Sequence, residues 1–185
     1  AAVCALVFLV RHLRGRGVYA MSLPADHPFL RQWLAGCPTR RPVSIRVSDR
    51  ICAPLTYGVF RPVVLLPRDM DWEDLETLAY VLAHEFHHIR SCDVVRRWAL
   101  AAAACLHWFD PLVWVMYAVA GRDMELACDE AAASCFAWGS PAGYARALVA
   151  MEEGRSSGSP FASHFSQSTR EARVKALMAA GRRGP

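Results

Sequence analysis

The feature that most constrains the fold is an unbroken segment from Trp72 to Cys92, which contains neither glycine nor proline. Acidic residues stand near its start, and Asp69 or Asp71 is expected to cap a helix there. Apolar residues recur at three- and four-residue steps and predict one buried helical stripe, made up of Leu75, Leu78, Leu82, Phe86 and Ile89. Inside this apolar pattern stands HEFHH, at residues 84–88. Packing alone gives an apolar helix no reason to hold a carboxylate and three imidazoles.

The spacing of HEFHH suits a metal ion. His84 and His88 are one helical turn apart and about 40° apart around the axis, so both can bind one ion. Glu85 lies about 60° from His88, too far round to chelate but close enough to hold the water that zinc activates. This is the H-E-x-x-H arrangement, in which zinc lowers the pKa of water to near 7 and the glutamate accepts its proton. A polar helix face with solvated histidines is the alternative, and His87 is expected to lie outside the ligand set.

Catalytic zinc needs a third protein ligand, and several downstream side chains qualify, namely His107, Asp110, Glu125, Asp129 and Glu130. Glu125 and Asp129 are four residues apart and therefore share one face of a predicted helix. A metal ligand at Glu125, with Asp129 orienting the N–H of a ligand histidine, is chemically coherent. Ordinary surface acids remain the alternative. Cys128 is left out, because a thiolate beside two histidines is more typical of a structural zinc site.

Composition points towards a membrane. Apolar residues make up 54% of the 185 residues, more than is usual in a soluble domain, although charged residues still make up 21%. The net charge is +4, and no stripe of arginines interleaves with aromatic residues, so no direct binding of nucleic acid is expected. The seven cysteines include no C-x-x-C pair, which favours reduced thiols over a disulfide framework. The length predicts one principal core.

Four regions are predicted along the chain. Residues 1–12 read as the end of a transmembrane helix with a basic flank, since their apolar run is shorter than the roughly 20 residues that span a bilayer. A buried N-terminal helix is the alternative. Residues 13–42 form a juxtamembrane linker or helix. Residues 43–153 form a zinc metallopeptidase domain, including a hydrophobic segment, 98–120, that could be embedded in the membrane. Residues 154–185 form a flexible loop and a basic C-terminal helix.

The predicted fold is α+β and mainly helical: a zincin-like metallopeptidase domain with a small β-sheet and membrane-associated hydrophobic helices. Short strands are expected between Val43 and Leu66, and the prolines on both sides of VVLL suggest a short or edge strand. HWFDP is expected to break the segment 98–120 into two helices, which either re-enter the membrane or pack against the domain. A further helix is predicted from Arg122 to Phe136.

Four blocks of sequence resemble the BlaR/MecR family of membrane-embedded zinc metallopeptidases: APLTYGVFRPVVLLP, AHEFHHIRSCD, LHWFDPLVWVMYA and RDMELACDE. They occur in that order between Pro54 and Glu130, and FASHFSQSTREARVKALM resembles the tail of the family as well. The resemblance implies a gluzincin-type peptidase on the cytoplasmic side of the bacterial inner membrane. It implies a zinc ion bound by His84, His88 and Glu125, with Glu85 as the base and Asp129 as a partner of a ligand histidine. The chain departs from the family at Asp110, where asparagine is expected.

The predicted function is therefore that of a zinc-dependent endopeptidase acting on a cytoplasmic or membrane-proximal protein in antirepressor-type signalling. A transcriptional repressor is one candidate substrate, and a homodimer is one candidate assembly. The alternatives are an HtpX-like quality-control protease and a non-catalytic signalling module that contains zinc. Sensing of β-lactams is not predicted, because these residues contain no S-x-x-K motif. The residue that stabilises the oxyanion is left open among Tyr117, Tyr144 and His107.

Overall fold

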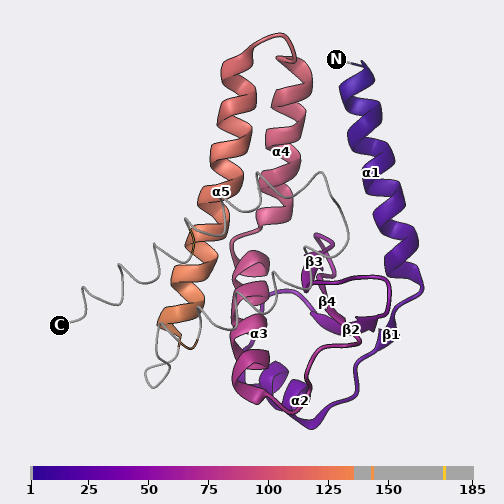
Figure 1. Cartoon of the computed structure of the whole chain (residues 1–185), viewed down its shortest axis with the longest axis vertical. Coiled ribbons are helices and arrows are strands. Elements are labelled where there is room, and N and C mark those ends of the chain that lie inside the picture. Colours follow the sequence, from indigo (N-terminus) through magenta and orange to yellow (C-terminus); the bar gives the residue numbers. More distant parts are fainter. Residues whose placement is uncertain (1, 136–142, 144–172, 174–185) are drawn as a thin grey trace, which may run out of the picture.

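The computed structural model describes residues 2–135 together with Gly143 and Arg173. Most of the predicted C-terminal region, 154–185, therefore lies outside the described residues. The described elements are, in order, α1 (Ala2–Ala20), β1 (Leu23–Pro24), α2 (Pro28–Gly36), β2 (Ser44–Ser48), β3 (Leu55–Tyr57), β4 (Val63–Pro67), α3 (Leu75–Arg90), α4 (Asp93–Leu106) and α5 (Pro111–Ser134). The protein is α+β and mainly helical, with a small sheet, as predicted (Figure 1).

The sheet is mixed and has the strand order β1-β2-β4-β3. β2 and β4 are parallel, whereas β1 and β3 pair antiparallel with their neighbours. VVLL was predicted to be a short or an edge strand; β4 is short, at 5 residues, but the edge position is wrong, because β4 lies between β2 and β3. Its prolines stand at the limits of the strand, Pro62 before it and Pro67 as its last residue. The residues between them keep the N–H groups that a central strand needs.

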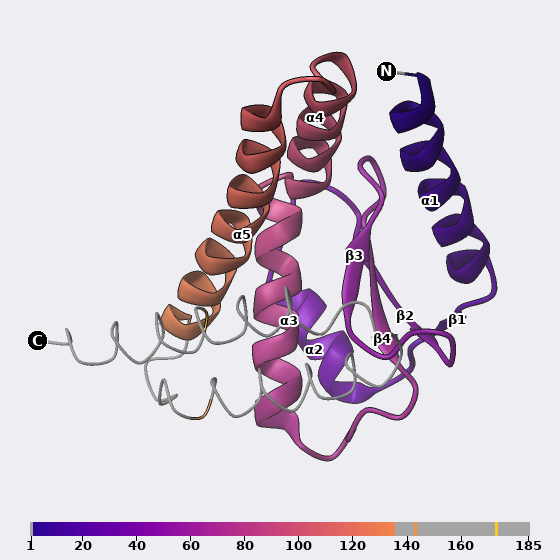
Figure 2. The same cartoon turned by 45° about the horizontal axis from the view of Figure 1, so that its top comes forward.

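The core lies between one face of this sheet and the helices α2 and α3 (Figure 2). The predicted stripe on α3 is confirmed at four positions that are buried in this core: Leu78, Leu82, Phe86 and Ile89. Leu75 is the exception and is 45% exposed, because it is the first residue of the helix and lies beyond the sheet. The cap was also predicted wrongly. Asp74, rather than Asp69 or Asp71, accepts a hydrogen bond from the backbone N–H of Thr77.

The predicted break at HWFDP is confirmed, since α4 ends at Leu106 and α5 begins at Pro111. Asp110 caps α5 by accepting a hydrogen bond from the N–H of Leu112. A separate helix starting at Arg122 was predicted wrongly, because α5 continues without interruption to Ser134. The glycine before Arg122 does not end the helix. One interior glycine costs only about 1 kcal/mol relative to alanine, which a helix of 24 residues tolerates.

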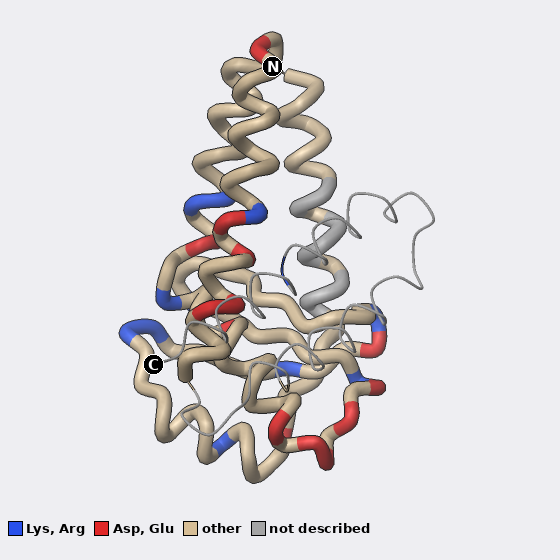
Figure 3. Tube along the Cα trace, turned by 60° about the vertical axis from the view of Figure 1, so that its left-hand side comes forward, with Lys and Arg blue, Asp and Glu red and all other residues tan. Residues whose placement is uncertain are grey.

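Three helices carry large apolar side chains away from the sheet. The start of α1 projects beside the turn that joins α4 to α5 (Figure 1), and the tube in Figure 3 shows almost no charge near that turn apart from one acidic residue. We call residues 2–10 and 98–119 the apolar end, and α2, α3 and β1–β4 the sheet end. The exposed side chains of the apolar end include Val3, Leu6, Val7, Leu9, Trp98, Leu106, Trp108, Phe109, Leu112, Trp114, Val115, Met116 and Val119. Among the described residues, no helix combines the length and apolar character needed to cross a bilayer.

Candidate metal centre

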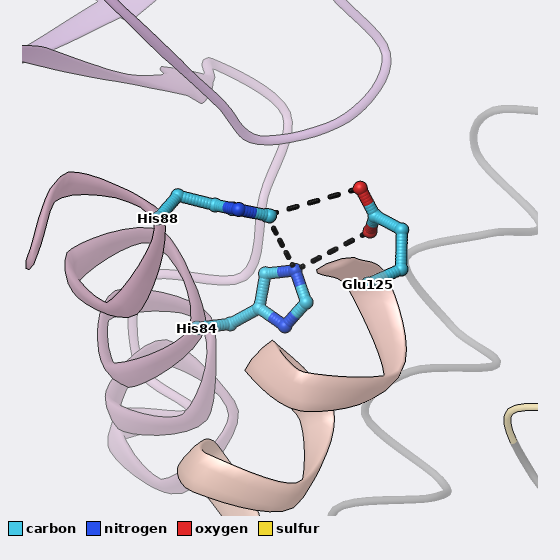
Figure 4. A group of neighbouring side chains, drawn as sticks. All are labelled: His84, His88 and Glu125. Atoms are coloured by element: carbon cyan, nitrogen blue, oxygen red, sulfur yellow. Dashed lines mark hydrogen bonds and ion pairs between the residues drawn. The ribbon is translucent and has the colours of Figure 1, made fainter. Parts of the chain in front are cut away.

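Three predicted ligands lie together where α3 packs against α5 (Figure 4). The Nε2 atoms of His84 and His88 are 3.2 Å apart. One oxygen of Glu125 lies 3.6 Å from Nε2 of His84, and the other lies 3.9 Å from Nε2 of His88. A tetrahedral zinc ion with bonds of about 2.0–2.1 Å holds its ligand atoms ~3.3–3.4 Å apart. The separation of the two histidine nitrogens is close to those values, the glutamate oxygens lie somewhat farther away, and the donor set of two imidazoles and one carboxylate suits zinc.

Each of the two histidines has a carboxylate on its other ring nitrogen. Oδ1 of Asp129 lies 3.2 Å from Nδ1 of His84. Oδ2 of Asp93 lies 2.8 Å from Nδ1 of His88. Carboxylates in this position fix the tautomer and the orientation of metal-binding imidazoles. The pairing leaves Nε2 of both rings directed towards Glu125.

Asp93 was missed by the sequence reasoning. Asp93 lies three positions after the end of α3. If the helix had continued, Asp93 would lie on it at a position fixed by the helical repeat of about 100° per residue. Instead, Cys92 adopts a left-handed conformation with φ of 56°, and the chain turns sharply into α4. Asp93, the first residue of α4, is thereby buried against His88. A positive φ is uncommon in a residue other than glycine, so the sequence does not predict the turn at Cys92. The only sequence signal for the contact was an aspartate in RSCD that no other feature explained.

Cys128 lies beside the site without joining the three ligands. Its Sγ is 3.2 Å from Nδ1 of His88 and 3.6 Å from Oδ2 of Asp93. These three residues form a second group that could hold a metal ion. Burial raises the pKa of Cys128 strongly, and the charges of Asp93 and Glu125 raise it further. These effects favour the protonated form of the thiol.

Glu85 is buried beside His84 and hydrogen-bonded to the sheet. The hydroxyl of Thr56, in β3, donates a 2.6 Å hydrogen bond to Oε2 of Glu85. The residue is only 6% exposed. Thr56 was not singled out in the sequence, since contact between a strand residue and the H-E-x-x-H helix depends on tertiary packing. The bond fixes where the carboxylate lies relative to His84.

The other candidates lie elsewhere in the described structure. His107 caps the end of α4 and Asp110 caps the start of α5, so both belong to the turn of the apolar end. Glu130 is exposed, and His87 belongs to neither metal-capable group. Of the oxyanion candidates, Tyr117 packs edge-on against Phe8 of α1, with ring centroids 5.9 Å apart. Tyr144 lies outside the described residues.

The charges of the group are strongly coupled. Burial alone would lower the pKa of His84, but hydrogen bonds to Asp129 and Glu125 outweigh it and raise that pKa to about 9. Burial would raise the pKa of Glu125, but its hydrogen bond with His84 and the nearby positive charges hold it well below its usual range. Two arginines, Arg97 and Arg173, form ion pairs with Glu125. The arrangement favours an anionic carboxylate at the place where a cation would bind.

Comparison with known proteins places the chain in a family. The family model described as BlaR1 peptidase M56 matches residues 3–177. Among curated proteins, the chain is 35% identical over 82 residues to "Regulatory protein BlaR1" of Bacillus licheniformis, a match covering 44% of this chain and 14% of that protein. It is 22% identical over 133 residues to "Methicillin resistance mecR1 protein" of Staphylococcus aureus, which covers 67% of this chain and 22% of that protein.

The matched parts are thus less than a quarter of the length of these relatives. The family model, in contrast, covers nearly the whole chain. The resemblance predicted from the four sequence blocks is confirmed. The chain belongs to the BlaR1 peptidase M56 family, a family of peptidases.

Proposed function

We propose that this chain is a zinc-dependent endopeptidase of the bacterial inner membrane that cuts a cytoplasmic or membrane-proximal protein in regulatory signalling. The observation that carries the proposal is the juxtaposition of His84, His88 and Glu125 with a buried Glu85 from the same helix. The H-E-x-x-H arrangement with a distant glutamate is that of gluzincin peptidases, and it makes a zincin-like domain the best reading of the fold.

In this proposal His84, His88 and Glu125 hold the metal, and Glu85 moves the proton. Zinc, when bound, polarises a carbonyl and makes water acidic enough to attack at neutral pH. Glu85 accepts the proton of the attacking water at its carboxylate and then delivers it to the leaving amine. The hydroxyl of Thr56 holds the carboxylate in place for both transfers. Asp93 and Asp129 keep the two imidazoles turned with Nε2 towards the metal.

The edge strand β3 is the best candidate for the surface along which the substrate lies. It pairs with β4 on one side only, and β3 and β1 are the two edges of the described sheet. Thr56 stands in the middle of β3 and contacts Glu85. A peptide that adds to β3 as a further strand would therefore pass the proposed base with its backbone extended. Such binding reads the backbone more than the side chains, so specificity would come from neighbouring pockets.

The proposed location rests on the apolar end. Its exposed side chains would contact lipid, and its tryptophans, Trp98, Trp108 and Trp114, are of the kind that gathers at membrane interfaces. In the proposed orientation the metal centre faces the cytoplasm. The name of one relative refers to regulation and that of the other to methicillin resistance. A regulatory role is therefore proposed for this chain as well, with a repressor protein as the candidate substrate and without β-lactam sensing.

The test compares the wild-type chain with Glu85→Gln in bacterial cells. New protein N-termini are identified by mass spectrometry, and the zinc content of each purified protein is measured. We expect both proteins to hold one zinc ion, while cleavage by the variant falls about 10²–10⁴-fold. Glu76→Gln is the matched control, because Glu76 lies on α3 and bonds only Tyr80 among the hydrogen bonds described for its side chain.

Three results would decide against the proposal. Equal cleavage by the wild-type chain and Glu85→Gln would remove Glu85 as the base. Zinc bound without any cleavage by the wild-type chain would favour a non-catalytic signalling module. Cleavage of many misfolded membrane proteins, rather than of one regulator, would favour an HtpX-like quality-control role.

A further inference from the structure

Arg173 reaches the metal centre from a distant part of the chain. Its side chain is buried, with only 5% of the residue exposed. Nε donates a 2.6 Å hydrogen bond to Oδ2 of Asp129, and Nη2 donates a 2.7 Å hydrogen bond to Oδ1. Its Nη1 lies 3.8 Å from Oε2 of Glu125. A residue 44 positions beyond Asp129 therefore contacts both carboxylates that α5 contributes to the group.

The geometry of the contact determines what it can do. A guanidinium that donates two parallel bonds to one carboxylate fixes the plane of that carboxylate as well as its position. Oδ1 of Asp129 accepts from Arg173 and also lies 3.2 Å from Nδ1 of His84. The orientation of Asp129 thus determines where His84 points its other nitrogen, Nε2. The three residues form a continuous chain that ends at the proposed ligand atom.

The contact also balances charge. Asp129 is buried, and a buried carboxylate without a positive partner is strongly unfavourable. Arg173 supplies that charge within hydrogen-bonding distance and so keeps Asp129 an anionic acceptor for the N–H of His84. Lysine would supply the charge but not the two-pronged contact. The arrangement therefore needs arginine in particular.

The second histidine is supported differently. Asp93, the partner of His88, is five residues away and is itself contacted by Arg96, which is largely exposed and 3.3 Å distant. That support is local to the α3–α4 junction. The support of His84 depends on a residue far along the chain.

We propose that Arg173 is a positioning residue of the metal centre, which acts through Asp129 to orient His84 and makes the site incomplete without the C-terminal part of the chain. The inference rests on the proposed function, since it assigns His84 as a metal ligand. It assigns a role to a residue outside the three ligands, the base and the two aspartates.

The experiment measures metal affinity in the whole chain of 185 residues given by the sequence. Zn²⁺ binding is titrated against a chelator, and Co²⁺ is used as a spectroscopic probe of coordination. Arg173→Met, which keeps the apolar stem, is expected to weaken Zn²⁺ binding about 10–100-fold, the usual effect of removing a partner of a ligand. It should also change the Co²⁺ visible spectrum. Arg173→Lys should restore part of the affinity.

A double variant and a control variant test whether Arg173 acts through Asp129. In an Asp129→Ala background, Arg173→Met should add less than about a twofold loss, because the contact through which it acts is already gone. That double variant removes both members of the buried Arg173–Asp129 ion pair, so it also serves if Arg173→Met alone does not fold. Arg31→Met is the matched control, since Arg31 bonds Asp26 at 2.7 Å but on the surface. It should leave both metals bound as in the wild-type chain.

Wild-type affinity in Arg173→Met would overturn the inference and leave the proposed peptidase intact. An equal loss with and without Asp129 would also overturn it, because Arg173 would then act elsewhere. If the metal result is as expected but no cleavage is found in the Glu85 experiment, the proposed function fails and the positioning role stands. A wild-type chain that binds neither metal overturns both.

Discussion

The sheet end and the apolar end use the same residue types for opposite purposes. Leu82, in α3, is completely buried, whereas Leu106, in α4, is 70% exposed. The sheet end covers its apolar side chains with its own helices and strands. At the apolar end, large apolar side chains from three helices are exposed. The sheet end is therefore stabilised by its own buried core, whereas the apolar end presents a surface suited to an apolar partner.

The largest expected effect tests whether the sheet end is the stabilising half. Leu82→Ala should lower the free energy of unfolding by about 2–5 kcal/mol, because it leaves a cavity in the core. Leu112→Ala, at the exposed start of α5, should change it by less than about 0.5 kcal/mol. Chemical denaturation followed by circular dichroism measures both. Equal losses would mean that the apolar end is packed as tightly as the core.

The next effect tests the metal centre, which depends on buried charges rather than buried apolar groups. Asp93→Ala should weaken Zn²⁺ binding about 10–100-fold, since His88 loses the carboxylate that orients it. Isothermal titration against a competing chelator gives the affinity. Asp123→Ala is the control, because Asp123 is exposed and pairs with its neighbour Arg122. Unchanged binding in Asp93→Ala would show that His88 needs no such support.

A smaller effect tests the apolar end directly. Leu106→Ser should weaken binding to phospholipid vesicles roughly tenfold, which corresponds to the loss of about 1.5 kcal/mol from one leucine removed from lipid. Leu75→Ser is the matched control, because Leu75 is also exposed but belongs to the sheet end. Sedimentation with vesicles measures the bound fraction. The distinction between the two ends breaks down if both variants lose binding equally.

The smallest effect concerns the helix caps, one at each end of the molecule. Asp74→Ala and Asp110→Ala should each cost about 1 kcal/mol of unfolding free energy, and the asparagine variants should cost less. Thermal melts compare the four proteins. A cap that can be removed at no cost would mean that the tertiary contacts of that end alone hold the helix start.

Asp74 adds a dependence on pH to this comparison. The ordinary pKa of an aspartate is 3.8, and in the folded protein the pKa of Asp74 is lower. The main cause is the hydrogen bond from the backbone N–H of Thr77, and the side chain of Thr77 adds to it. The contribution of Asp74 is therefore present above pH 3.8 and is lost as the pH falls through the lower folded value. The stability difference between the wild-type chain and Asp74→Ala should shrink towards zero in acid. A difference that persists there would point to a role other than the charged cap.

Local periodicity explains what could be predicted. The stripe on α3, the break before Pro111 and the spacing of His84 and His88 follow from helical geometry and from proline within a few residues of sequence. The positions of Asp93, Thr56 and Arg173 depend on a left-handed turn, a strand packed beside α3 and a residue far along the chain. None of these has a local pattern. The catalytic roles of the site residues stay predictions.

The errors have the same origin. Prolines beside VVLL suggested a short or edge strand, but they stand at the limits of β4 and spare its interior, and β4 is a central strand. A separate helix was predicted from Arg122, whereas α5 continues through Gly121 to Ser134. In both cases the chain contains a residue that often interrupts a strand or helix, yet β4 and α5 form around it. Packing against neighbouring strands and helices stabilises them where the intrinsic preference of the residue does not.

Because α5 is one continuous helix, its position along α3 determines whether Glu125 lies beside the two histidines. The single helix α5 carries both Pro111, at the apolar end, and Glu125, at the site, which lie about 21 Å apart at 1.5 Å per residue. The histidines belong to a different helix, α3. A slide of α5 by one turn along α3 would move Glu125 by about 5.4 Å, farther than the ligand atoms can follow. The close approach of Glu125 to the two histidines therefore depends on the register between the two helices, and a displacement of α5 along its axis at the apolar end would move Glu125 away from them.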